Sequence, residues 1–138
     1  MQPLLWDTFT AIWIYEKARL SPAALEAMRA AYREGVPSYI SPITAWEVAL
    51  LASRGRLQLL IRPEPLVFEF VRSARRTSRG NVARRVLIAS SYLPGKPPKD
   101  PTDRIMAATA RELGATLITR DRALLDYGAQ GHVAVLEC

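Results

Sequence analysis

Acidic residues directly follow two predicted strands of this chain. Asp7 comes after the short apolar stretch 3–6, and Asp121 comes after 115–119, which is uncharged and β-branched like a buried parallel strand. Ligands of open parallel sheets bind outside the carboxyl ends of the strands, so both carboxylates are expected at the chemically useful edge. Asp7 also suits the N-cap of the next helix, and that structural role alone explains an aspartate there.

Two further acids lie on predicted helices next to these strands. Glu47 falls within the helix predicted over 42–54, on or beside its apolar face. A carboxylate on such a face is costly unless it binds a cation or pairs with a basic residue such as Arg54. Asp103 lies in the first turns of the helix predicted over 101–113. Both helices are therefore expected to bring a carboxylate toward the same edge of the sheet.

The four carboxylates form an all-oxygen ligand set, which hard cations such as Mg²⁺ and Mn²⁺ prefer. Zinc is not expected, because no cysteine or histidine accompanies them and the one histidine, His132, is interpreted as a surface residue. Without a cation, four clustered carboxylates would repel one another and some would hold protons. A cation lowers the pKa of bound water and polarises a phosphoryl group, so the set predicts phosphodiester hydrolysis by a metal-activated water.

The charge balance favours a polyanionic partner. The formal net charge is +6, and 16 of the 19 basic residues are arginines, whose planar guanidinium suits phosphate recognition. The segment 72–85 is rich in arginine and contains no acid. We expect it to face the phosphates of a nucleic acid, and a merely solvated surface is the alternative. The predicted RNA-binding residues are Arg75, Arg76, Arg79, Arg84 and Arg85.

Length and composition suggest one cytoplasmic domain over residues 1–138. The chain is 49% hydrophobic, which is enough for a substantial core. The only cysteine is Cys138, so no internal disulfide is expected. No signal peptide and no apolar run long enough for a bilayer are evident, so no membrane association is expected.

The remaining predicted elements alternate helices with short strands, which is typical of an α/β fold with a parallel sheet. They are helices over 10–19, 22–34, 66–76 and 82–93, a strand over 38–40, a helical turn over 122–127 and a last strand over 132–136.

At the acidic residues the sequence resembles the PIN-domain family, in particular the small VapC-like toxins of toxin–antitoxin pairs. LLWDT at 4–8 is similar to the opening apolar-Asp-Thr motif of the family, and SPITAWEVALLASRGRL at 41–57 to its glutamate-bearing helix. DPTDRIMAATARELGATLITRD at 100–121 is the most specific match. Within it, Asp100 suits the N-cap of the predicted helix better than a metal ligand, and Gly114 suits the C-cap. The resemblance covers most of the chain and implies a three-layer α/β/α fold with a mainly parallel central sheet.

The resemblance also implies a metal-dependent endoribonuclease that cuts single-stranded or loop RNA and leaves a 3′ hydroxyl and a 5′ phosphate. It implies that the Mg²⁺ or Mn²⁺ ligands are Asp7, Glu47, Asp103 and Asp121. Thr8, Thr44 and Thr119 match polar positions that line such sites. Arg104 matches the arginine of the motif, where it would contact phosphate or brace the neighbouring acids. The expected partners are an RNA substrate, a cognate antitoxin protein and a second copy of the chain in a homodimer.

The sequence departs from the family pattern in two places. Relatives often have histidine where this chain has Phe9, a position that is not a metal ligand. Relatives also have an apolar middle strand where this chain has the basic segment 72–85. Either residues around Val71 form that strand, or the sheet is locally short.

Two other functions remain open at this point. A PIN-fold RNA-binding or assembly module without catalysis is one, although such domains usually lose the acids that this chain retains. A structure-specific DNA nuclease with the same site is the other, although the chain is small and has no evident DNA-binding appendage. The effect of divalent metal on thermal stability would test the first, and competition between RNA and DNA would test the second.

Overall fold

A parallel sheet forms the centre of the computed structural model, which describes residues 1–57 and 82–138. In these ranges its strands run in the order β2-β1-β3-β4, and all neighbours are parallel. The strands are β1 (Leu4–Trp6), β2 (Ser38–Ile40), β3 (Thr116–Thr119) and β4 (Val135–Glu137). The predicted parallel sheet is therefore confirmed for the described part of the chain, and β4 begins three residues later than the predicted last strand.

The direction of winding changes at the carboxyl end of β1. The chain passes from β1 to β2 on one side, whereas β3 and then β4 lie on the other side of β1. In the register, Trp6 at the end of β1 lies opposite both Ile40 and Ile118. The direction of winding thus reverses between β1 and β3, and ligands of open α/β sheets bind at such a reversal.

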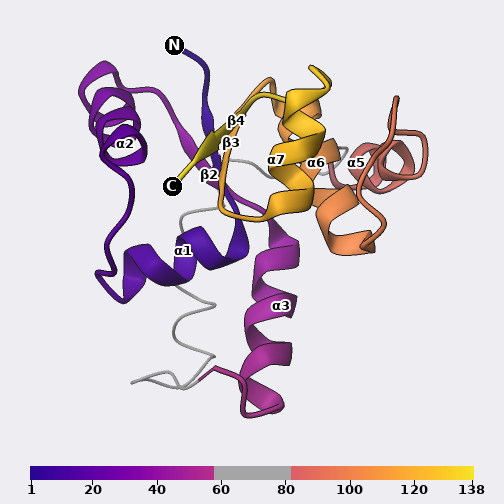
Figure 1. The fold of residues 1–138 in the computed structure, drawn as a ribbon, viewed down its shortest axis with the longest axis horizontal. Helices are drawn as coiled ribbons and strands as arrows, with labels where there is room; N and C mark the ends of the chain where they lie inside the picture. The colour runs from indigo at the N-terminus through magenta and orange to yellow at the C-terminus, as the bar shows by residue number, and fades with distance from the viewer. Residues whose placement is uncertain (58–81) are drawn as a thin grey trace.

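Helices cover both faces of the sheet because side chains alternate along each strand. The helices α6 and α7 lie on one side of the sheet, and α1 and α2 lie on the other (Figure 1). Leu5 and Leu117 belong to the apolar cluster on the first side, and Leu4 and Ile118 to the cluster on the second. The helices are α1 (Thr8–Tyr15), α2 (Pro22–Glu34), α3 (Pro42–Ser53), α5 (Val82–Ser90), α6 (Pro101–Leu113) and α7 (Arg122–Ala129). This is the expected three-layer α/β/α arrangement.

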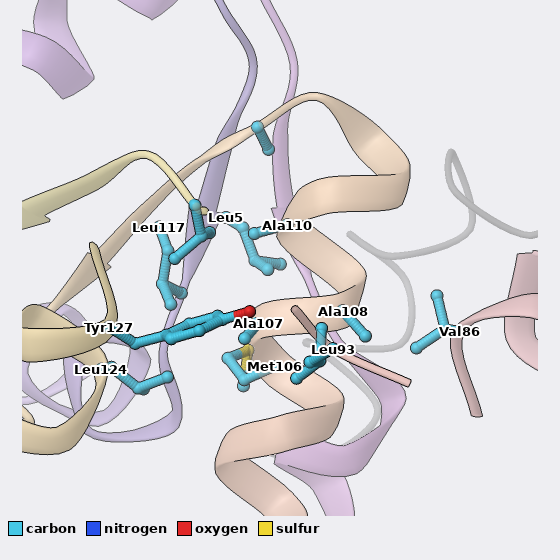
Figure 2. Close-up of a cluster of buried hydrophobic side chains, with 12 residues drawn as sticks. Leu5, Val86, Leu93, Met106, Ala107, Ala108, Ala110, Leu117, Leu124 and Tyr127 are labelled. Atoms are coloured by element: carbon cyan, nitrogen blue, oxygen red, sulfur yellow. The ribbon is translucent and has the colours of Figure 1, made fainter. Parts of the chain in front are cut away.

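The larger apolar cluster lies between α6, α7 and the sheet (Figure 2). Met106, Leu124 and Tyr127 are almost completely buried there, and the Tyr127 hydroxyl donates a hydrogen bond to the Pro94 carbonyl at 2.8 Å. Burial of large apolar side chains is the main favourable contribution to folding. This cluster therefore fixes α6, whose first turn carries Asp103.

Local signals set the helix boundaries. Asp100 caps α6 and Gly114 ends it in the left-handed conformation, both as predicted. The helix α1 begins at Thr8, two residues before the predicted start, because the Asp7 side chain caps it there. The helix α5 ends at Ser90, three residues before the predicted end.

Several predictions fall on residues 58–81, outside the described ranges. They are the helix over 66–76, the possible strand near Val71, and the basic residues Arg75, Arg76 and Arg79. Among the helices of the two described ranges, none combines the length and the apolar character that crossing a membrane would require.

Candidate functional site

Asp7 lies at the switch point between β1 and β3. Its backbone N–H donates to the Ile118 carbonyl at 3.1 Å and thereby extends the β1–β3 ladder by one residue. One carboxylate oxygen accepts the Thr8 backbone N–H at 2.8 Å, and the other accepts the Thr119 hydroxyl at 2.7 Å. Asp7 therefore does cap α1, as the structural interpretation predicted, and the same carboxylate is also bonded across the sheet to β3.

Thr119 connects the ends of the two strands. Its side chain is completely buried, and its hydroxyl both donates to Asp7 and accepts the backbone N–H of Asp121 at 3.0 Å. The exposed Asp121 carboxylate caps α7 by accepting the Leu124 N–H at 3.0 Å. One buried hydroxyl thus fixes the relative positions of the residues that follow β1 and β3.

Glu47 joins this group through threonines on α1 and α3. The Thr8 hydroxyl donates to Glu47 Oε1 at 2.7 Å and lies 3.2 Å from the Thr44 hydroxyl. Both threonines are almost completely buried, whereas Glu47 is partly exposed. The described residues show no ion pair between Glu47 and Arg54, whose side chain is exposed. Pairing with Arg54, one alternative for Glu47, is therefore not observed, whereas the partial exposure of Glu47 is also compatible with a side chain that extends to the edge of the helix face.

Asp103 lies in the first turn of α6, partly buried. Asp100 caps that helix, and its carboxylate accepts the Thr102 N–H at 2.8 Å and the Asp103 N–H at 3.4 Å. Burial raises the pKa of the Asp103 carboxyl to about 7, and the negative charges of other acids add to this increase. These acids are Asp121, Asp100, Asp7 and Glu47. The structure therefore brings all four predicted acids into one electrostatic group.

The pKa values of two other acids in this group, Asp7 and Glu47, are shifted in the same direction as that of Asp103. Burial raises the pKa of Asp7, although hydrogen bonds from Thr119 and Thr8 oppose this effect. Burial likewise raises the pKa of Glu47, opposed mainly by the hydrogen bond from Thr8. Throughout the described ranges, no basic side chain forms an ion pair with any of the predicted acids. Within residues 1–57 and 82–138, no ion pair therefore compensates their negative charge.

The chemistry of these donors fits a hard divalent cation, with one restriction. Among residues 1–57 and 82–138, no three acidic, histidine or cysteine side chains are close enough to ligate one ion together. Mg²⁺ usually keeps several waters and is held through only one or two carboxylates. The described residues therefore fit a largely hydrated cation in an acidic field better than a closed cage of four direct carboxylate ligands.

In the described ranges, the hydrogen bonds and ion pairs of the predicted arginines go to groups other than the four acids. Arg104 donates to the backbone carbonyls of Ser90, Pro98 and Ser91, at 2.9, 3.2 and 3.4 Å. It therefore ties the segment after α5 to α6, and in the described residues it forms no ion pair with the neighbouring acids, while its contact with phosphate stays a prediction. Arg85, on α5, pairs with Glu112 at 3.5 Å, and Arg84 is exposed on the same helix.

Comparison with known proteins identifies the family. The family model described as "PIN domain" matches residues 4–130. The chain belongs to the PIN-domain family. Ribonuclease VapC22 of Mycobacterium tuberculosis is a similar PIN relative, 34% identical over 128 residues, which cover 92% of this chain and 93% of that protein. The VapC-like resemblance noted in the sequence is thus confirmed. No solved structure matches this PIN chain significantly.

Sequence reasoning left one acid out of the group in this PIN domain. Asp100 was interpreted only as an N-cap, and that role is confirmed, but its charge also raises the pKa of Asp103. The spacing contained this signal, because residues three apart in a first helical turn lie on the same side of the helix.

Proposed function

We propose that this protein is a metal-dependent endoribonuclease that acts as the toxin of a toxin–antitoxin pair. The observation that carries the proposal is the partly buried acidic group around Asp103, which lacks an ion pair with a basic residue in the described residues and lies at the switch point of the sheet. The similarity to a protein named a ribonuclease gives independent support. The reaction would be hydrolysis of RNA phosphodiester bonds.

The acids would hold Mg²⁺ or Mn²⁺, and the threonines would hold the acids. The proposed cation-binding residues are Asp7, Glu47, Asp103 and Asp121. When bound, the cation would lower the pKa of a water molecule and neutralise negative charge on the phosphate. The Thr119 hydroxyl donates to Asp7 and the Thr8 hydroxyl donates to Glu47, and each hydrogen bond restricts the rotation of the carboxylate that accepts it.

No serine or cysteine nucleophile is needed in this scheme, because water is the attacking group. The arginines would bind flanking phosphates, and Arg84 and Arg85 are exposed on α5 as this role requires. Arg75, Arg76 and Arg79 complete the proposed basic segment. We also propose that the chain is a single domain, forms a homodimer, acts in the cytoplasm and is neutralised by a cognate antitoxin.

The first experiment measures cleavage of a mixed RNA pool with Mn²⁺, with EDTA, and by the Asp103→Asn variant with Mn²⁺. Replacing a residue that orients a metal ligand typically costs about 10- to 100-fold, so loss of a ligand should reduce cleavage at least 100-fold. Asp126→Asn is the matched control, because Asp126 is exposed on α7 and forms an ion pair with Arg122 at 3.9 Å. The control should cleave at the parental rate.

Cleavage by the parent and by Asp126→Asn in Mn²⁺ but not in EDTA, with little cleavage by Asp103→Asn, would support both the activity and the site. Equal cleavage by Asp103→Asn would show that the acidic group is not the site. If no RNA is cut and Mn²⁺ leaves the melting temperature unchanged, the non-catalytic RNA-binding or assembly module becomes the better explanation.

A further inference from the structure

An exposed aromatic side chain lies immediately beside the acidic group. Phe9 is 46% exposed although it is large and apolar, and it follows Thr8, which bonds to Glu47, and Asp7. Consecutive Cα atoms are 3.8 Å apart, so the Cα atoms of Phe9 and Asp7 are separated by at most about 8 Å. Neighbouring nucleotides of one strand could therefore contact both residues.

Trp13 lies against the Phe9 ring, and Arg120 lies against Trp13. The ring centroid of Trp13, one turn further along α1, lies 5.8 Å from that of Phe9, with a tilt of 34° between the planes. The Arg120 guanidinium carbon lies 4.0 Å from the centre of the Trp13 ring, which is a close cation–π contact. Phe9, Trp13 and Arg120 together form what we call the aromatic–arginine strip.

Arg120 is held in place without losing its charge. It donates through Nε to the Cys138 carbonyl and through Nη2 to the Arg19 carbonyl, the latter at 2.7 Å. None of the ion pairs found in the described part of the chain involves Arg120. Arg120 stands between Thr119 and Asp121 in the chain, so its backbone adjoins the acidic group, while its guanidinium lies over Trp13.

We infer that the aromatic–arginine strip is a stacking platform for an unpaired RNA base next to the scissile phosphate, with Phe9 as the contacting ring. The inference rests on the proposed ribonuclease activity and names a substrate-binding residue for it. Proteins that bind single-stranded RNA stack bases on aromatic rings and use cations to attract the backbone. The strip combines both features within a few residues of the acids, and its fixed cation favours a polyanionic strand as the occupant.

The role of each residue in the strip differs. Phe9 would touch the base, whereas Trp13 is partly buried and would support the Phe9 ring. Arg120 is a positioning residue that holds Trp13 and adds charge for the adjacent phosphate. The platform would select unpaired RNA over duplex RNA, because bases within a duplex are already stacked on one another.

The test uses the intact protein in EDTA, where binding is measured without cleavage. The probe is a single-stranded oligouridine with one central 2-aminopurine, whose fluorescence falls when the base stacks. The parent should quench the probe, and Phe9→Trp should quench it at least as strongly. Phe9→Leu keeps an apolar side chain but loses the ring, so it should lose most of the quenching and bind about 5- to 150-fold more weakly.

Tyr32→Leu is the matched control, because Tyr32 is an aromatic residue on α2 that is 89% exposed. It should change neither quenching nor affinity. Arg120→Gln should reduce the salt dependence of binding by about one ion. The melting temperature of Phe9→Leu should match that of the parent, since the Phe9 ring is nearly half exposed.

Equal quenching by the parent and Phe9→Leu would overturn the inference while leaving the ribonuclease proposal intact. A parent that neither binds nor cuts RNA would refute both. If Phe9→Leu binds RNA normally but fails to bind the cognate antitoxin, the strip is a protein interface and the inference is wrong.

Discussion

The helix α6 passes through two regions with opposite energetics. Its first turn carries Asp103, whose pKa is raised to about 7 by burial and by the surrounding acids. Its later turns carry Met106 and the small residues Ala107, Ala108 and Ala110, which are almost completely buried against the sheet and α7 (Figure 2). The first turn therefore destabilises the metal-free protein, whereas the later turns stabilise it.

This difference indicates how the acidic group is maintained. Repulsion and desolvation oppose gathering carboxylates at one edge, and local interactions among the acids do not remove that cost. Rigid packing a few residues away keeps Asp103 in place despite this repulsion and desolvation. A helix that is apolar on one face and acidic at its start can thus hold a strained charge distribution that a loop would relax.

The largest expected effect on stability comes from the apolar region. Met106→Ala should lower the free energy of unfolding by about 2–5 kcal/mol, because it leaves a cavity while keeping a good helix former. Chemical denaturation would measure this change. Cleavage per folded molecule should remain near the parental value, because Met106 belongs to the apolar cluster. Loss of cleavage in fully folded Met106→Ala would show that the two regions are not separable.

Adding metal should increase the free energy of unfolding through the acidic region, whereas Met106→Ala should lower it. A cation that binds only the folded protein stabilises it by about 2.7 kcal/mol at 100 times its dissociation constant. Mn²⁺ should therefore raise the melting temperature of the parent and of Asp126→Asn, and should have little effect on Asp103→Asn. Thermal unfolding at increasing Mn²⁺ would measure this difference. An equal increase in all three proteins would place the cation elsewhere.

The elements that carry the acids were predictable because their signals are local. The cap at Asp100, the stop at Gly114 and the β-branched stretch that became β3 all act over a few residues. The ends of parallel strands meet at one edge whatever their order, so the meeting of Asp7 with Asp121 also followed from the sequence. The resulting proximity is confirmed by the Thr119 hydroxyl, which bonds to both residues.

Other features were not predictable because they depend on packing between distant segments. The Thr8–Glu47 hydrogen bond joins residues 39 positions apart and exists only because α1 packs on α3. The Arg104 motif suggested phosphate or acids, but the fold places carbonyls of Ser90, Ser91 and Pro98 around the guanidinium. Sequence spacing does not show which group a long flexible side chain will reach.

Removing the Thr119 hydroxyl would test, by changing one polar group, how far the acidic region depends on support from its buried neighbours. Thr119→Val retains the shape but loses the bonds to Asp7 and to the Asp121 backbone. We expect cleavage to fall about 10- to 100-fold, as for other groups that orient metal ligands. Thr109→Val is the matched control, because Thr109 is buried on α6 and its hydroxyl bonds only to the Ile105 carbonyl, at 2.6 Å. Equal cleavage by the two variants would mean that Asp7 needs no such support.

The smallest expected effect is a pH dependence of stability without metal. In the unfolded chain the Asp103 carboxyl loses its proton near its ordinary pKa, whereas in the folded protein the pKa is about 7. Between these values the folded state binds more protons, so the free energy of unfolding decreases as pH rises from about 4 to about 7, then levels off. The partial exposure of Asp103 allows solvent to screen its charge, so the decrease should be modest.

Comparison of variants isolates this contribution from that of other acids. Asp7 and Glu47, whose pKa values are also raised, add a decrease of the same sign, whereas Asp100, whose pKa is lowered, opposes it. In EDTA, Asp103→Asn should match the parent near pH 4 and exceed its stability above pH 7, while Asp126→Asn should follow the parent throughout. Denaturation at several pH values would measure this. Parallel curves for Asp103→Asn and the parent would show that Asp103 ionises normally, and the acidic first turn of α6 would then carry no strain for the apolar turns to offset.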